Sequence, residues 1–305
     1  PHVGSHPRAA FVETNVTGTL TLLEEAVAAG VGRFIFTSTT SAFGRALTPP
    51  PGAPAAWITE DVRPVPRNIY GVTKVAAEDL CELVHRDHGM PVLILRTSRF
   101  FPEPDDRDDV RAAFPDANLK VNELLYRRVD LEDVVDAHRR ALERAPELGF
   151  GRYIVTATTP FAPDDLTALR ADAPAVVRRL YPEYEALFAA RGWRMFDSIE
   201  RVYVNERARR ELAATGETVR KRTVGAPVLT YFNWNAGGVL TAGRLGEVLG
   251  LVHGRYPDEV AVLVMYSWSC SKPLGRDPNM HYDSWRESEV ARFDEFIGAI
   301  GGHTE

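Results

Sequence analysis

The sequence predicts an α/β protein built on a parallel sheet. Two short runs rich in β-branched and aromatic residues, RFIFTST (33–39) and PVLILRT (91–97), read as strands, and a helical stretch from about residue 69 to residue 88 separates them. Runs that are apolar at nearly every position suit strands that are buried on both faces. The order strand, helix, strand is therefore typical of a parallel sheet covered by helices.

A long amphipathic helix is expected before the first strand. Apolar residues, among them Phe11, Leu20 and Val27, recur at helical spacing from residue 8 to residue 29, and Gly30 is a suitable stop. We expect three units: a sheet domain (1–102), a smaller, mainly helical substrate domain (103–213) and an extra C-terminal α/β segment (214–305). In the last segment, APVLTYFNW and DEVAVLVMYSW read as strands, and TAGRLGEVLGLVHG and SEVARFDEFIGAI read as helices.

Composition and charge limit the classes of molecule that we expect this protein to bind. A net charge of -6 gives no electrostatic reason to expect nucleic acid or an anionic membrane, and no run of about 18 apolar residues is present. The two cysteines, Cys81 and Cys270, match no metal-binding spacing, and the histidines are too scattered to indicate a metal site. We expect a cytoplasmic protein with a small-molecule substrate and no metal.

Tyr70 and Lys74 in IYGVTK are a candidate catalytic pair. Residues four apart on a helix lie on one face, so both side chains can point into the same cleft. A lysine ammonium close to a tyrosine stabilises the phenolate and draws its pKa from near 10 toward the range of acid–base catalysis. The spacing alone is weak evidence, because both residue types are common on exposed helices.

A cluster of hydroxyl side chains ends the first strand. It consists of Thr37, Ser38, Thr39, Thr40 and Ser41. The carboxyl edge of a parallel sheet is where such folds bind ligands, and there Thr39 is placed to donate a hydrogen bond to a substrate oxygen. The alternative is that the hydroxyls cap and turn the strand end.

Six ordered pieces, spread over residues 1–212, resemble one family. They are ETNVTGTLTLLEEAV, FIFTSTTSAFG, IYGVTK, LILRTSRFFP, YRRVDLEDVVDAH and VYVNERARREL. Together they resemble the extended short-chain dehydrogenase/reductases of the NAD-dependent epimerase/dehydratase group. The resemblance implies that residues 1–102 are the C-terminal half of a Rossmann-like NAD(P)-binding domain. It also implies a homodimer formed through the helices around Asn15 and Tyr70.

The same resemblance implies roles for individual residues. Tyr70 is the acid–base catalyst, Lys74 binds the ribose of NAD or NADP, Thr39 orients the substrate and Asn15 supports the site. Further cofactor contacts are implied for Tyr70, Thr37, Ser38 and Pro102. We also expect Thr40 and Arg99 to contact the substrate. Asp130 and Asp133 are expected to cap the start of a helix.

Two departures from the family pattern affect these expectations. Arg99 stands where nucleotide-sugar epimerases carry an asparagine, which favours a carboxylate or phosphate on the substrate or, equally, an ion pair with the acidic run 105–109. This puts a nucleotide-sugar substrate in doubt. In addition, no glycine-rich strand–turn–helix precedes Pro1, so we expect the chain to begin partway through a longer sequence.

These observations predict an NAD(P)-dependent epimerase/dehydratase or oxidoreductase acting on a hydroxyl or carbonyl of a small, sugar-like or anionic substrate. The alternative is a non-catalytic, truncated remnant of that family. For residues 214–305 three interpretations stay open: a second dinucleotide loop in NWNAGGVLTAGRLG, a fused piece resembling the endonuclease/exonuclease/phosphatase fold, or a tail without a function of its own.

Overall fold

A computed structural model shows the fold of this chain. The structure describes residues 7–100, 105, 108–212, 228–233 and 261–266. Within these ranges no helix combines the length and the apolar character that crossing a membrane requires.

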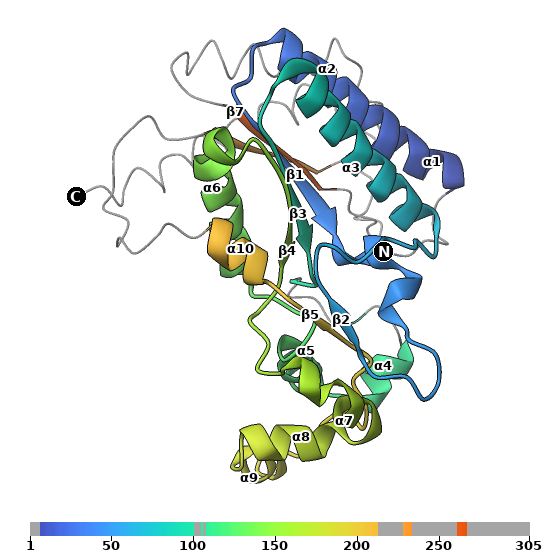
Figure 1. Cartoon of the computed structure of the whole chain (residues 1–305). Coiled ribbons are helices and arrows are strands. Elements are labelled where there is room, and N and C mark those ends of the chain that lie inside the picture. The colour runs from blue at the N-terminus through green and yellow to red at the C-terminus, as the bar shows by residue number, and fades with distance from the viewer. Residues whose placement is uncertain (1–6, 101–104, 106–107, 213–227, 234–260, 267–305) are drawn as a thin grey trace, which may run out of the picture.

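The centre of the molecule is a three-stranded parallel sheet (Figure 1). Its strands are β1 (Phe34–Thr39), β3 (Val92–Thr97) and β4 (Phe150–Val155), in the order β1-β3-β4. In the register of the first pair, Phe34 lies opposite Val92 and Thr39 lies opposite Thr97. Strands β1 and β3 are buried almost throughout, which is why their sequences show no alternation of apolar and polar residues. The predicted α/β class and its parallel, Rossmann-like sheet are confirmed.

Helices cover both faces of this sheet (Figure 1). On one face lie α1 (Arg8–Val12), a π-helical turn η1 (Glu13–Thr17), α2 (Gly18–Ala28) and α3 (Ile69–His88); on the other lies α6 (Leu131–Leu148). The π turn interrupts the single long helix that the periodicity predicts. Alternate residues of β1 pack on opposite sides, with Phe36 toward α2 and α3 and Ile35 toward α6.

Local signals in the sequence set the ends of the two longest helices. The side chain of Asn68 accepts a hydrogen bond from the amide of Gly71 at 2.9 Å and caps α3, which ends at Gly89 with a left-handed φ of 69°. Asp130 caps α6 through the amide of Glu132 at 3.1 Å, so its predicted capping role is confirmed.

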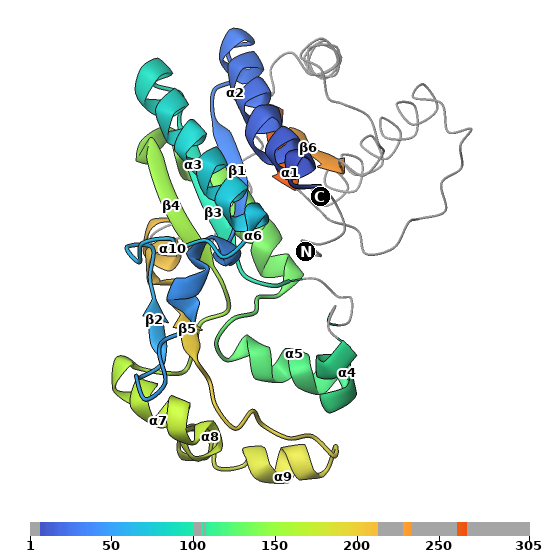
Figure 2. The ribbon, with the colours of Figure 1, turned by 90° about the vertical axis from the view of Figure 1, so that its right-hand side faces the viewer.

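A smaller layer lies beyond one end of the sheet (Figure 2). Here β2 (Ala56–Ile58) pairs in parallel with β5 (Arg201–Tyr203). The accompanying helices are α4 (Asp108–Ala113), α5 (Asp116–Leu124), α7 (Leu166–Ala171), α8 (Ala173–Leu180) and α9 (Tyr184–Ala189), together with the 3-10 turns η3 (Arg45–Leu47) and η4 (Pro163–Asp165). The 3-10 turn η2 (Thr40–Phe43) packs against α3 and β3 of the central sheet. A separate apolar cluster, which includes Leu169, Val176 and Ile199, holds this layer together.

Each layer draws residues from both sides of position 102. Strand β2 precedes that position and belongs to the smaller layer, whereas β4 and α6 follow it and pack with the central sheet. The helix α10 (Glu206–Glu211) also contacts β4. The division into units 1–102, 103–213 and 214–305 stays a proposal about domain organisation.

Both strands predicted in the C-terminal segment are present. They are β6 (Val228–Asn233) and β7 (Ala261–Tyr266), which pair in parallel, and β7 lies alongside β1. The two helices predicted for this segment, and the candidate dinucleotide loop, lie outside the described residues.

Candidate active site

The candidate site lies where β1 ends and α3 begins. Thr39 is the last residue of β1, the turn η2 starts at Thr40, and α3 packs against both. Because Asn68 caps α3, Tyr70 and Lys74 fall in the first two turns of the helix, and the four-residue spacing puts them on one helical face. Tyr70 is partly exposed. The fold thus brings the predicted pair to the carboxyl edge of the sheet.

Lys74 is a buried cation held against β1. Its side chain is 3% exposed, its Nζ donates a hydrogen bond to the carbonyl oxygen of Thr37 at 2.8 Å, and the same atom lies 4.0 Å from the centre of the Phe36 ring. Burial lowers the pKa of Lys74 to about 8, and the nearby carboxylate of Glu78 opposes this shift. Lys74 therefore carries a proton at neutral pH but gives it up more readily than an exposed lysine.

Internal partners hold the two hydroxyls that precede Thr39. Thr37 Oγ1 lies 2.8 Å from His138 Nε2 on α6, and Ser38 Oγ donates to Glu78 Oε1 on α3 at 2.5 Å. The structure thus gives both hydroxyls partners inside the protein. The contacts of Thr37 and Ser38 with a cofactor stay predictions.

Thr39 and Thr40 take part in the turn that follows the strand. Thr39 Oγ1 accepts a hydrogen bond from the amide of Ser41 at 3.1 Å, and Thr40 Oγ1 lies 3.4 Å from the carbonyl oxygen of Thr97. The capping alternative is thus seen at Thr39. Its side chain is nevertheless partly exposed, and no described residue accepts the proton of its hydroxyl. Thr39 retains a donor for a ligand oxygen.

Asn15 connects the π-helical turn to α3. Its Nδ2 donates to Thr73 Oγ1 at 2.9 Å, one residue before Lys74, and its backbone oxygen accepts from Thr19 Oγ1 at 2.7 Å. The residue is 2% exposed, and its Oδ1 has no hydrogen-bond partner among the described residues. A buried acceptor without a partner costs free energy, and π turns are frequent at functional sites. The supporting role of Asn15 in the site stays a prediction.

Three further residues of the site escaped the sequence analysis: Glu78, Arg96 and His138. Glu78 is 1% exposed and accepts hydrogen bonds from Arg96 Nε at 3.1 Å and Nη2 at 2.7 Å. The signal was present in the sequence: an arginine that ends the apolar run VLILR needs a buried carboxylate, and Glu78 lies one turn after Lys74. His138 has no comparable signal, because its partner Thr37 is 101 residues away.

Arg99 and Pro102 complete the predicted set. Arg99 Nη1 pairs with Asp105 Oδ2 at 2.5 Å, and the arginine side chain is 27% exposed. Of the two alternatives for Arg99, the structure thus shows the ion pair with the acidic run. Pro102 lies outside the described residues.

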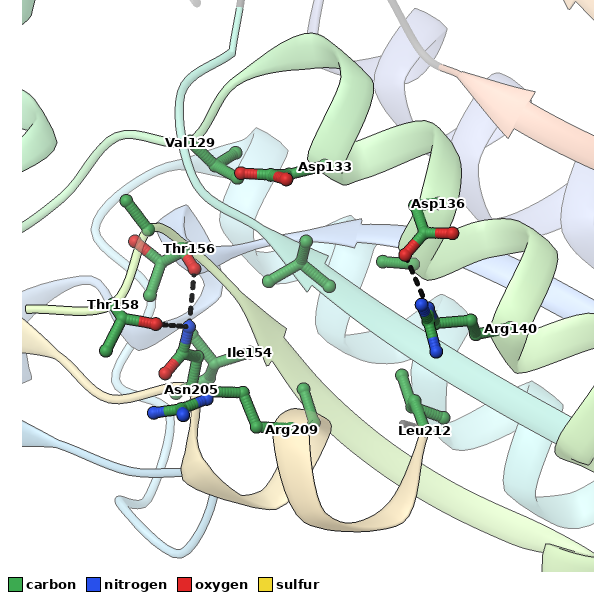
Figure 3. Close-up of a pocket in the computed structure, with 14 residues that line it drawn as sticks. Val129, Asp133, Asp136, Arg140, Ile154, Thr156, Thr158, Asn205, Arg209 and Leu212 are labelled. Carbon is green, nitrogen blue, oxygen red and sulfur yellow. Dashed lines mark hydrogen bonds and ion pairs between the residues drawn. The ribbon is translucent and has the colours of Figure 1, made fainter. Parts of the chain in front are cut away.

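A separate cavity of about 290 Å³ lies between α6, the end of β4 and α10 (Figure 3). Its wall includes Asp133 and an ion pair between Asp136 and Arg140, and Asn205 Nδ2 donates to the carbonyl oxygen of Thr156 at 2.8 Å. None of the predicted catalytic, cofactor-binding or substrate-binding residues lines this cavity. Among the described residues, no group of three or more His, Cys, Asp or Glu side chains is arranged to hold a metal ion.

Curated relatives are similar to part of this chain. The low-salt glycan biosynthesis protein Agl12 of Haloferax volcanii is 38% identical over 91 residues, which are 30% of this chain and 27% of that protein. UDP-glucose 4-epimerase of Rhizobium meliloti is 40% identical over 82 residues, 27% of this chain and 22% of that protein. UDP-arabinose 4-epimerase 1 of Arabidopsis thaliana is 29% identical over 170 residues, with 46% of this chain and 39% of that protein covered. The chain therefore spans less than half the length of these relatives.

A solved structure of UDP-glucuronic acid 4-epimerase from Bacillus cereus in complex with NAD aligns with a TM-score of 0.41 and 20% identity, covering 66% of this chain and 61% of that one. The family model for the NAD dependent epimerase/dehydratase family matches residues 2–155, half of the chain. The chain belongs to the NAD dependent epimerase/dehydratase family.

Proposed function

We propose that this chain carries the acid–base half of an NAD(P)-dependent epimerase or dehydratase site. The observation that supports it most is the buried ammonium of Lys74, one helical turn after the partly exposed Tyr70 and bonded to the strand that ends in Thr39. A cation with a lowered pKa, one helical turn from a tyrosine near the carboxyl edge of a parallel sheet, suits general acid–base catalysis.

In the proposed mechanism Tyr70 exchanges a proton with a hydroxyl or carbonyl oxygen of the substrate. The ammonium of Lys74 favours the phenolate form of Tyr70 by its charge. Thr39 donates a hydrogen bond to the same substrate oxygen and so orients it. Asn15 holds the first turns of α3 in place through Thr73.

The cofactor we propose is NAD or NADP, which when bound accepts a hydride from the substrate carbon and returns it. The donors that are present fit such a group. Lys74 carries three N–H bonds and donates one to Thr37 within the described residues, so its ammonium has donors for a ribose hydroxyl. Tyr70 lies on the same helical face.

The substrate class we propose is a sugar nucleotide, as the names of the relatives UDP-glucose 4-epimerase and UDP-arabinose 4-epimerase suggest. Arg99, in place of the asparagine of nucleotide-sugar epimerases, weighed against this class. Its ion pair with Asp105 offsets the charge that would have called for an additional anionic group on the substrate.

The test is turnover. The chain and its Tyr70→Phe variant are incubated with NAD and, separately, UDP-glucose and UDP-arabinose, and the anomeric protons are followed by NMR. We expect a new epimer or a 4-keto product with the unsubstituted chain and a loss of about a hundredfold or more with Tyr70→Phe. No product from either substrate, or equal rates for both proteins, would contradict the proposal and favour the non-catalytic alternative.

We also propose a homodimer through α1 and α3. Three large apolar side chains on these helices are exposed: Val12 at 44%, Val72 at 51% and Leu83 at 39%. Exposed apolar side chains on these two helices favour pairing with a second copy. Sedimentation velocity is expected to show a dimer that Val72→Glu weakens; an unsubstituted chain that is monomeric at micromolar concentration would rule this out.

A further inference from the structure

His138 joins the candidate site from the opposite face of the sheet. It lies on α6, whereas Tyr70 and Lys74 lie on α3, and β1 runs between the two helices. The side chain is 7% exposed. Its ring spans two partners: Nδ1 lies 2.7 Å from the carbonyl oxygen of Val134, and Nε2 lies 2.8 Å from Thr37 Oγ1.

These two contacts fix the tautomer of His138. A carbonyl oxygen only accepts, so Nδ1 must carry the ring proton. A neutral imidazole has one N–H, and Nε2 is then an acceptor, so the hydroxyl of Thr37 donates to it. Burial also lowers the pKa of His138, which favours the neutral ring. Of the two neutral tautomers, only the Nδ1–H form satisfies all three groups.

Thr37 is also the residue that holds Lys74. Its side chain is bonded to His138, and its carbonyl oxygen accepts the hydrogen bond from Lys74 Nζ at 2.8 Å. The next residue is held from the other face, since Ser38 Oγ donates to Glu78. The dipeptide that precedes Thr39 is therefore fastened on both sides of the sheet, and one of the two fastenings is His138.

We infer that His138 is a positioning residue of this site: in its Nδ1–H form it fixes Thr37, and through the carbonyl of Thr37 it fixes the ammonium of Lys74. The inference rests on the proposed function for its role in catalysis. The geometric part, from His138 to Lys74, stands on the contacts of the folded chain and is testable without substrate or cofactor.

The experiment uses NMR of the full chain. The sequence contains four lysines, so selective labelling of lysine with ¹³C and ¹⁵N gives few side-chain signals, and Lys74→Arg assigns the one of interest. Titration gives the pKa of Lys74 in four proteins: the unsubstituted chain, His138→Leu, His138→Gln and Thr37→Val. Labelling of histidine gives the tautomer of His138 from its ring ¹⁵N shifts, with His138→Gln as the assignment control.

We expect the Nδ1–H tautomer at neutral pH. In His138→Leu the hydroxyl of Thr37 loses its acceptor and the carbonyl is less firmly placed, so the pKa of Lys74 falls further, by roughly half a pH unit or more. His138→Gln keeps an acceptor amide oxygen and restores most of the original value. Thr37→Val moves the pKa in the same direction as His138→Leu, because both changes break the same contact.

An Nε2–H tautomer, a charged ring at pH 7, or a Lys74 pKa that is the same in all four proteins would overturn the inference. If His138→Leu does not fold, Thr37→Val and His138→Gln decide the question. The proposed function can fail separately. If the pKa of Lys74 changes when His138 is substituted but the chain shows no turnover, the positioning role stands and the catalytic role is removed.

Discussion

Arg96 and Lys74 are two buried cations near the end of β1, and the groups that surround them differ. Each is 3% exposed. Arg96 shares its charge with both carboxylate oxygens of Glu78, whereas Lys74 has a carbonyl oxygen and an aromatic ring, and no salt bridge involving Lys74 occurs in the described part of the chain. Glu78 offsets the charge of the buried Arg96 guanidinium, whereas burial without a close carboxylate lowers the pKa of Lys74 to about 8. The contrast separates a structural charge from one suited to catalysis.

The largest expected effect comes from breaking the paired cation. Glu78→Ala leaves the guanidinium of Arg96 buried without a carboxylate, and the free energy of unfolding should fall by roughly 3 to 5 kcal/mol in urea titrations. Glu82→Ala is the matched control, because its ion pair with Arg152 is partly exposed and worth about 1 kcal/mol or less. Equal losses for the two variants would contradict this account of Glu78.

The second effect concerns the pH dependence of stability. The pKa of Lys74 is about 8 in the folded chain and 10.5 without burial, so the unfolded chain binds more protons between these values. The unfolding free energy should therefore rise with pH from 8 to 10.5, by about 2 to 3 kcal/mol from this group. Lys74→Met lacks that rise and is more stable than the unsubstituted chain at pH 7. Parallel stability profiles for the two proteins would show that Lys74 is not desolvated.

A smaller effect is expected at Thr37. Thr37→Val keeps the shape of the side chain but leaves Nε2 of His138 without its donor, which should cost roughly 1 to 2 kcal/mol of unfolding free energy. Thr40→Val is the control, since its contact with the carbonyl oxygen of Thr97 is long, at 3.4 Å. A greater loss at Thr40 than at Thr37 would count against the role given to the His138 contact.

The smallest effect comes from an ion pair in water. Arg178 and Glu185 bond to each other on the surface, and each side chain is 52% exposed. Arg178→Ala should leave the urea midpoint unchanged within experimental error, since solvent screens an exposed pair. A clear shift would mean that exposure is a poor guide to which charges matter in this chain.

Much of the fold could be predicted because its information is local. The apolar runs that became β1 and β3 are buried on both faces, and Asn68, Asp130 and Gly89 mark helix ends by their own chemistry. The π turn at 13–17 escaped prediction because its residues carry no local signal that distinguishes them from an α-helical turn. The assignment of β4 and α6 to the central sheet depends on pairing between distant segments, which a reading of local patterns does not supply.

The candidate site, too, has some features that local sequence predicts and others that depend on distant residues. The spacing of Tyr70 and Lys74 and the hydroxyl cluster of β1 are visible in short stretches of sequence. The partners that hold the cluster are not, because His138 and Glu78 lie 101 and 40 residues from the hydroxyls they bind. The hydroxyls of Thr37 and Ser38 thus looked like ligand contacts, and the structure gives them internal partners.

The central claim is that the ammonium of Lys74 belongs to a cofactor-dependent site. Binding of the nicotinamide cofactor tests this claim most directly. NADH and NADPH are titrated by fluorescence into the full chain and into Lys74→Met, which is expected to fold at least as stably. We expect the unsubstituted chain to bind one cofactor and the variant to bind it with an affinity at least about tenfold lower, because a charge-assisted hydrogen bond to the ribose is lost. Equal affinities, or no binding to the unsubstituted chain at millimolar cofactor, would contradict it.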